Sequence, residues 1–126
     1  MKKAFTLLEM LIVLGIIAVI LSVLTVSYAT AQKKSRDAKR RGDLKGVQNA
    51  LEQYYSACGY QYPNGSSLNP PVTCAAAVGV NFLPTMPADP KTGVSYSYSS
   101  DGTTFSLCTT SIESDVITGY CVANQQ

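Results

Sequence analysis

The chain has 126 residues, of which 46% are hydrophobic and 14% are charged, and its formal net charge at neutral pH is +2. This length allows one small domain beside a membrane segment. The sequence contains no histidine, no Gly-rich phosphate loop, no CxxC pair and no carboxylate pair at a recognisable catalytic spacing, so nothing in it points to an enzyme or to a zinc site.

The first feature in chain order is a short basic leader, residues 1–4, followed by a long apolar segment. Phe5–Gln32 contains a single charged residue, Glu9, and Met10–Gln32 contains none. The segment is long enough to span a hydrocarbon layer of about 30 Å. A charge at the centre of such a helix is disfavoured by roughly 2.5–3.5 kcal/mol, and by less near its end, so Glu9 requires a cationic partner.

These residues resemble the class III signal of type IV prepilins and pseudopilins. In that family a membrane peptidase cuts before a Phe and methylates the new amine, and a Glu is the fifth mature residue; Phe5 and Glu9 occupy those positions. The resemblance implies cleavage between Ala4 and Phe5, N-methylation of Phe5, and pairing of Glu9 with the Phe5 amine of a neighbouring subunit. Ala4 replaces the usual Gly before the cut, and Val26 stands where many members have Pro.

The segment and its Glu9 each leave other interpretations open. It is compatible with an ordinary signal anchor in which the position of Glu9 is accidental. Within the prepilin interpretation, Glu9 has two alternatives to a neighbour: its own Phe5 amine, or hydration at the membrane interface.

A helical pattern continues beyond the apolar segment, because no proline or turn sequence interrupts it. Lys33–Lys45, the basic belt, holds seven basic and two acidic residues. Its pairs Asp37/Arg41 and Lys39/Asp43 have the i,i+4 spacing of a solvated helical face. Apolar residues then recur at the spacing of a buried helical face: Leu44, Val47, Leu51, Tyr54, Tyr55 and Cys58.

The sequence predicts a single helix from Phe5 to Cys58, about 80 Å long at 1.5 Å per residue. Gly42 and Gly46 each weaken a helix by roughly 1 kcal/mol relative to Ala, so they are candidate bends. Gly59 is the expected C-terminal stop.

Beyond this helix, the sequence predicts loops and a small antiparallel sheet. Residues 60–80 are rich in turn-forming residues, and the prolines of Phe82–Pro90 exclude both a helix and a central strand. Three strands are expected: one in which Val94, Tyr96 and Tyr98 alternate with serines, then Thr104–Thr110 and Val116–Ala123. Six tyrosines are expected in the core and rim between helix and sheet: Tyr54, Tyr55, Tyr60, Tyr62, Tyr96 and Tyr98.

This second half of the chain resembles the pseudopilin branch of the same family. That branch has a helix ending in a run like Ala50-Leu-Glu-Gln-Tyr-Tyr55, then a Gly-x-Tyr-Pro turn and an Asp-Pro before a small sheet. Gly59–Pro63 matches loosely, with one extra residue, and Asp89-Pro90 and the Ser-Tyr-Ser-Tyr run match well.

All four cysteines follow the apolar segment, which indicates an exported domain with two disulfides. Cys58 ends the helix and Cys74 ends the loop, while Cys108 and Cys121 fall on successive predicted strands. We therefore predict Cys58–Cys74 and Cys108–Cys121, although spacing alone does not fix connectivity.

From Gly46 onward, beyond the basic belt, Lys91 is the one basic residue against five acids. We expect the belt to contact lipid headgroups before assembly and the acidic heads of neighbours in a filament; sequence-independent DNA binding is the alternative. Four acids are calcium candidates, with solvated turn acids as the simpler interpretation: Asp89, Asp101, Glu113 and Asp115. The positive-inside rule alone would leave the head in the cytoplasm, whereas the cysteines and the prepilin resemblance place it outside.

The sequence thus predicts an α+β fold in which the second half of a long N-terminal helix packs on a small sheet. Its segments are a leader (1–4), a membrane-spanning and assembly half of the helix (5–32), a basic and amphipathic half (33–58) and a disulfide-stapled head (59–126). The resemblance implies a structural subunit of a type IV pilus-like filament. Its expected partners are a prepilin peptidase, an assembly platform with its ATPase, the membrane before assembly and further copies of itself. The alternatives are a pseudopilin of a type II secretion or DNA-uptake machine, and a monomeric membrane-anchored binding module.

Overall fold

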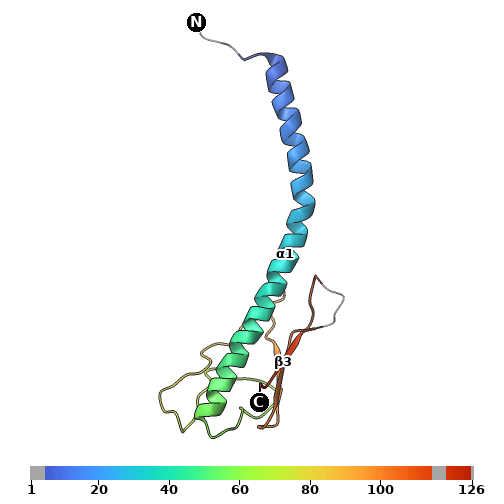
Figure 1. The fold of residues 1–126 in the computed structure, drawn as a ribbon. Coiled ribbons are helices and arrows are strands. Elements are labelled where there is room, and N and C mark those ends of the chain that lie inside the picture. Colours follow the sequence, from blue (N-terminus) through green and yellow to red (C-terminus); the bar gives the residue numbers. More distant parts are fainter. Residues whose placement is uncertain (1–4, 115–118, 126) are drawn as a thin grey trace.

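The structure, a computed structural model, describes residues 5–114 and 119–125, with the backbone alone for residues 24–27. It consists of one long helix and a small head folded against the C-terminal half of that helix (Figure 1). This is the α+β arrangement that the sequence predicts.

Helix α1 runs from Leu7 to Ala57, within two residues of the predicted bounds at each end. Its 51 residues give a length of about 77 Å. Thr6 is the N-cap, and its side chain accepts a hydrogen bond of 3.2 Å from the backbone N–H of Glu9. At the other end Gly59 has a φ of +80°, a conformation that glycine adopts without strain, and the chain turns back there as predicted.

The two glycines predicted as candidate bends do not interrupt the helix. Gly42 and Gly46 are both exposed, and α1 continues through them (Figure 1). The nearby side chains of Leu44 and Val47, on the other face of the helix, are almost completely buried against the head. Packing of this face outweighs the roughly 1 kcal/mol that each glycine costs.

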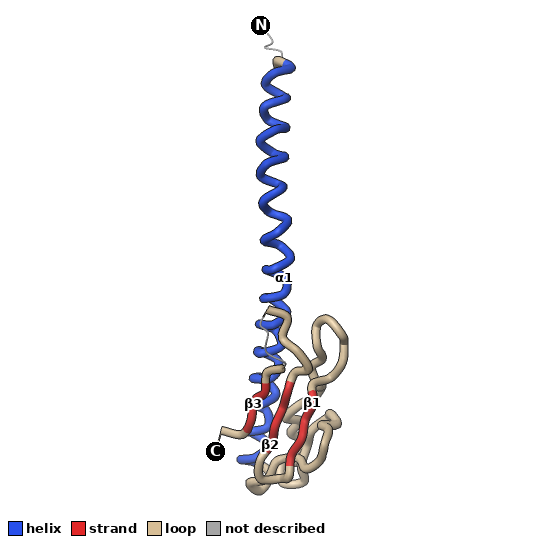
Figure 2. The backbone as a smooth tube through the Cα atoms, turned by 90° about the vertical axis from the view of Figure 1, so that its right-hand side faces the viewer, coloured by secondary structure: helices blue, strands red, loops and turns tan. Residues whose placement is uncertain are grey.

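The head contains three antiparallel strands in the order β1-β2-β3: β1 (Ser97–Ser100), β2 (Phe105–Cys108) and β3 (Cys121–Ala123) (Figure 2). In the register, Tyr98 lies opposite Leu107, and Leu107 lies opposite Val122. These three residues share the buried face of the sheet, which packs against α1.

The predicted strands were too long. Val94 lies outside β1 and is exposed. Its backbone groups are used in a tight loop, since its N–H donates to Thr92 Oγ1 and its C=O accepts from Asp89 N. The third predicted strand, Val116–Ala123, is reduced to β3, and residues 116–118 lie outside the described residues.

The core lies between the C-terminal half of α1 and the sheet. Its buried apolar members come from the helix, the loops and the strands: Leu44, Val47, Leu51, Tyr62, Leu68, Val72, Leu83, Tyr96, Tyr98, Phe105, Leu107 and Val122. Tyr62 stacks on Tyr55 with ring centroids 4.7 Å apart. Tyr60, in contrast, is 71% exposed, so it belongs to the rim.

Candidate functional site

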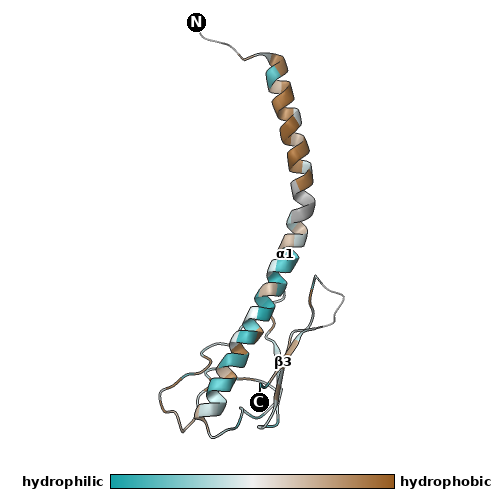
Figure 3. Cartoon of the chain, viewed as in Figure 1, coloured by the Kyte–Doolittle hydropathy of each residue, from teal (hydrophilic) through white to brown (hydrophobic). Residues whose placement is uncertain are grey.

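The N-terminal half of α1 projects away from the head, and no other described segment lies beside it (Figure 2). Its large apolar side chains from Leu7 to Val23 are 45–84% exposed on all sides of the helix. In Figure 3 the ribbon of this half is mostly in the hydrophobic colour, apart from a hydrophilic position near its start, whereas the half beside the head is mostly hydrophilic. By length and composition, α1 is long and apolar enough to cross a membrane.

Glu9 is exposed in the first turn of this apolar half. Thr6 and Glu9 form the Thr-x-x-Glu pattern of a capping box, of which the structure shows the bond from Glu9 N to Thr6 Oγ1. This pattern is readable from the Thr6–Glu9 spacing but was not among the predicted features. An acid here is stabilised by the positive end of the helix dipole, so Glu9 also has a local role at the start of the helix.

The residues of the predicted cleavage site are only partly visible. Phe5 is 77% exposed just before the helix begins, whereas Ala4 lies outside the described residues. Cleavage between them and methylation of Phe5 therefore stay predictions.

Within the basic belt, Arg40 is buried in a network of three carboxylates. Its side chain is 1% exposed. Arg40 Nη1 donates to Asp37 Oδ1 at 2.6 Å, Nε and Nη2 donate to Asp89 Oδ2 and Oδ1 at 2.5 and 3.1 Å, and Nη2 also donates to Glu113 Oε1 at 3.0 Å. The guanidinium thus joins α1 to the loop before β1 and to the loop after β2.

Further donors complete the network around these acids. Arg36 binds Glu113 through two bonds of 2.9 and 2.7 Å, and Lys91 Nζ lies 3.2 Å from Glu113 Oε2. Asp37 accepts from the backbone N–H groups of Glu113 and Ser114 at 3.0 and 2.7 Å. Within the described part of the chain, no buried side-chain nitrogen or oxygen lacks a hydrogen-bond partner.

The network shifts the ionisation of its members. The Arg40 hydrogen bonds hold the pKa of Asp89 well below its usual range, against the opposing effect of burial. Burial alone would raise the pKa of Asp37, but hydrogen bonds from Ser114, Glu113 and Arg40 outweigh it and lower the pKa to about 2. The bonds from Arg36, then from Arg40 and Lys91, lower the pKa of Glu113. All three acids are therefore ionised at neutral pH.

This network corrects the predicted solvated pairs of the belt. Asp37 was expected to pair with Arg41 in solvent, but it is buried and bonded to Arg40. Asp43 was expected to pair with Lys39, but its Oδ2 accepts a 2.9 Å hydrogen bond from the Tyr96 hydroxyl. Tertiary partners in the head replace the local ones, because they come with burial and fixed geometry.

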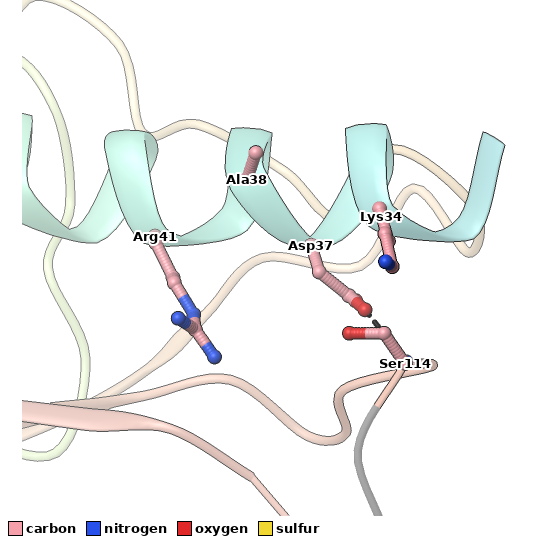
Figure 4. Close-up of a pocket in the computed structure, with 5 residues that line it drawn as sticks. All are labelled: Lys34, Asp37, Ala38, Arg41 and Ser114. Carbon is pink, nitrogen blue, oxygen red and sulfur yellow. Dashed lines mark hydrogen bonds between the residues drawn. The ribbon is translucent and has the colours of Figure 1, made fainter. Parts of the chain in front are cut away.

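A shallow hollow of about 300 Å³ lies beside the network, lined by Lys34, Asp37, Ala38, Arg41 and Ser114. Figure 4 shows the side chains of Lys34, Asp37 and Arg41 projecting from α1 towards the loop that carries Ser114. The guanidinium carbon of Arg41 lies 5.5 Å from the ring centroid of Tyr120.

The structure does not bring the four calcium candidates together. Asp89 and Glu113 are bonded to Arg40, so their charges are already neutralised. Asp101 lies elsewhere, in the turn between β1 and β2, where its Oδ1 accepts from the backbone N–H groups of Thr103 and Thr104. Asp115 lies outside the described residues. Among the residues that are described, no group of three acids or cysteines is placed to hold a metal ion.

Both disulfides have the predicted partners. Cys58 is joined to Cys74, which connects the end of α1 to the following loop. Cys108 is joined to Cys121 across paired positions of β2 and β3.

The described chain thus joins an apolar helix, long enough to cross a membrane, to a disulfide-bonded head. Residues 1–25 match the family model of the prokaryotic N-terminal methylation motif. This motif is the class III prepilin-type signal of type IV pilins and pseudopilins, a family of structural subunits. It implies processing by a prepilin peptidase and, with the apolar half of α1, fits a membrane-anchored precursor.

The match covers the N-terminal segment alone. No curated protein and no solved structure matches the chain.

Proposed function

We propose that this chain is a structural subunit of a type IV pilus-like filament, cut by a prepilin peptidase and polymerised through α1. The observation that carries the proposal is the apolar half of α1, exposed on all sides directly after the prepilin signal. Such a surface is stable in lipid or among other apolar helices, but not in water. A bundle of sister helices replaces lipid contact without exposing this surface, and an assembly platform with its ATPase supplies the work of extraction.

In this proposal Glu9 sets the register of one subunit against the next. Cleavage would leave Phe5 with a free amine, which is protonated at neutral pH and stays charged after methylation. Glu9 lies one turn beyond Phe5 and is exposed, so it is accessible to the amine of a neighbour. Two charges that meet in an apolar bundle neutralise each other, whereas either one alone would be strongly disfavoured.

A pseudopilin of a secretion or DNA-uptake machine is the second candidate. It is supported by the run of Ala50 to Tyr55 at the end of the helix and by Asp89-Pro90 before the sheet, which resemble that branch. Both candidates share processing and helix-driven assembly. They differ in whether the filament extends from the cell surface or remains short within the envelope.

Shearing surface material from cells that express the chain distinguishes these candidates. We expect filaments in the electron microscope whose mass spectrum contains the head peptides, and their absence from cells without the prepilin peptidase. Envelope-confined assembly together with a defect in secretion or DNA uptake on deletion would favour the pseudopilin. A subunit that is processed but never cross-links to another copy would contradict both and leave the monomeric module.

A further inference from the structure

The seven basic side chains of the belt separate into different environments in the folded chain. Arg36 and Arg40 turn towards the head and are neutralised by its acids. Lys33, Lys34 and Lys39 are exposed and make no hydrogen bond or ion pair with any described residue. Their ammonium groups are therefore accessible to a partner outside the subunit.

The acids of the head are already engaged within the same subunit. Of those that the structure describes beyond residue 36, all but Asp101 are buried or half-buried and accept hydrogen bonds from their own chain: Asp37, Asp43, Glu52, Asp89 and Glu113. The exposed Asp101 is held in its own turn. Among these described acids, Asp101 is therefore the one left exposed to the belt of another subunit, and Asp115 lies outside the described residues.

The position of the first two lysines along α1 points to the membrane surface. If the hydrocarbon layer begins just after Glu9, about 30 Å of helix ends near Ala29. The Cα atoms of Lys33 and Lys34 then lie about 6–8 Å beyond it, at the depth of the headgroups. Side chains of a helix tilt towards its N-terminus, which here is the direction of the membrane. The Cα atom of Lys39 lies about 15 Å beyond the hydrocarbon, which is too far from the membrane for its side chain to reach a lipid phosphate.

We propose that Lys33 and Lys34 bind the phosphate groups of anionic phospholipids in the leaflet next to the head. The lysines supply two exposed ammonium groups at the correct depth, and neither forms an ion pair with a described acid. The proposal concerns the membrane stage of the proposed function and needs no filament. The contact holds the subunit at a fixed depth, with the head directly below the headgroup layer.

The test uses the full chain reconstituted in phosphatidylcholine vesicles with a trace of spin-labelled phosphatidylglycerol or spin-labelled phosphatidylcholine. Electron paramagnetic resonance then measures the relative association of the two labels with the protein. One lysine beside an anionic surface contributes about a fivefold preference. We therefore expect the preference for phosphatidylglycerol to fall at least about fivefold in K33Q/K34Q and to fall in the native chain at high salt.

The matched control is K39Q/K45Q, which removes the same charge from two exposed lysines of the same helix that lie farther from the membrane. It should keep the native preference. Lys2 and Lys3 of the leader are present in every variant, so the difference between variants carries the result. An equal loss in both double variants, or no preference in the native chain, would overturn the proposal.

DNA binding is tested on the same vesicles with a labelled duplex. Duplex binding that is lost in K33Q/K34Q, without any lipid preference in the native chain, would assign the lysines to nucleic acid and overturn the lipid proposal. Neither result depends on filament formation, so the failure of this proposal is separable from the failure of the proposed function.

Discussion

Replacing Arg40 with Leu should destabilise the head more than any other single change in the basic belt. The Arg40 side chain is 1% exposed and forms salt bridges of 2.5–3.0 Å with Asp37, Asp89 and Glu113. Leucine fills much of the same space but removes the cation. Asp37 and Asp89, which are 4% and 5% exposed, would then be buried charges without the cation that bonds them directly.

The magnitude follows from the cost of breaking a buried ion pair from one side, about 3–5 kcal/mol. A domain of this size has a total free energy of unfolding of about 5–10 kcal/mol, so Arg40→Leu should remove a third of it or more. Denaturant unfolding of the full chain in detergent micelles, followed by near-ultraviolet circular dichroism of the buried tyrosines, measures the change. The control Lys39→Leu, at an exposed position in the same belt, should stay within about 0.5 kcal/mol of the native chain.

A triple variant distinguishes the loss of the cation from a general failure of Arg40→Leu to fold. Arg40→Leu combined with Asp37→Asn and Asp89→Asn removes the buried charges together with their cation, and it should recover most of the lost stability. If Arg40→Leu alone lies within about 1 kcal/mol of the native chain, the network is not a source of stability and the reasoning fails.

The pH dependence gives a second, independent check of the same network. The pKa values of Asp37, Asp89 and Glu113 are lowered in the folded chain, the first to about 2. Below about pH 4 the unfolded chain therefore binds protons that the folded chain does not, and stability should fall as the pH drops from about 4 to 2. In Arg40→Leu the folded acids lose their cation, so this loss should be smaller. Parallel curves for the two proteins would contradict the assignment.

Three further predictions concern processing, assembly and the distal disulfide. Mass spectrometry of the mature chain should show cleavage between Ala4 and Phe5 and one added methyl group; an intact N-terminus would contradict the prepilin interpretation. Glu9→Ala should still insert and be cut, but it should accumulate in the membrane without filaments, with Glu9→Asp intermediate; normal filament numbers in the electron microscope would refute the register role. Non-reducing peptide mapping should recover Cys58 with Cys74, and replacing both with Ser should lower the free energy of unfolding by about 3 kcal/mol.

The sequence predicted features that depend on local patterns. An uninterrupted apolar run and a following 3.6-residue repeat place α1 within two residues at each end. Alternating tyrosines and serines locate β1. Val94 falls outside it, because its C=O accepts a hydrogen bond from Asp89 N in the preceding turn. Cysteines at the ends of neighbouring predicted elements gave disulfide partners that the structure also shows.

The arginine network could not be predicted in the same way. Arg40 and Asp89 are 49 residues apart, and Arg36 and Glu113 are 77 residues apart. Nothing in the spacing selects these partners over the i,i+4 neighbours on the same helix. The choice is made by the packing of two loops against α1, which buries Asp37 and brings Asp89 and Glu113 to the guanidinium.

The network and the Cys58–Cys74 disulfide secure opposite ends of the head. The apolar core is built on one face of α1 and on three strands of three or four residues each. A core of this size leaves loops at both ends that apolar burial alone cannot order. At the far end Cys58 ties the loop to the helix covalently.

At the end of the head nearer the apolar half of α1, two loops must be held, one before β1 and one after β2. A single disulfide would join only one of them to the helix. A guanidinium instead binds three carboxylates from separate directions, because its five N–H donors lie in a fixed plane. Arg40 therefore fastens two loops at once, directly below the two lysines that face the headgroups. Neutralising the head acids at this position also removes negative charge that would otherwise repel an anionic leaflet. Arg40 fastens the two loops, but balancing the three carboxylates also requires the positive charges of Arg36 and Lys91 on Glu113.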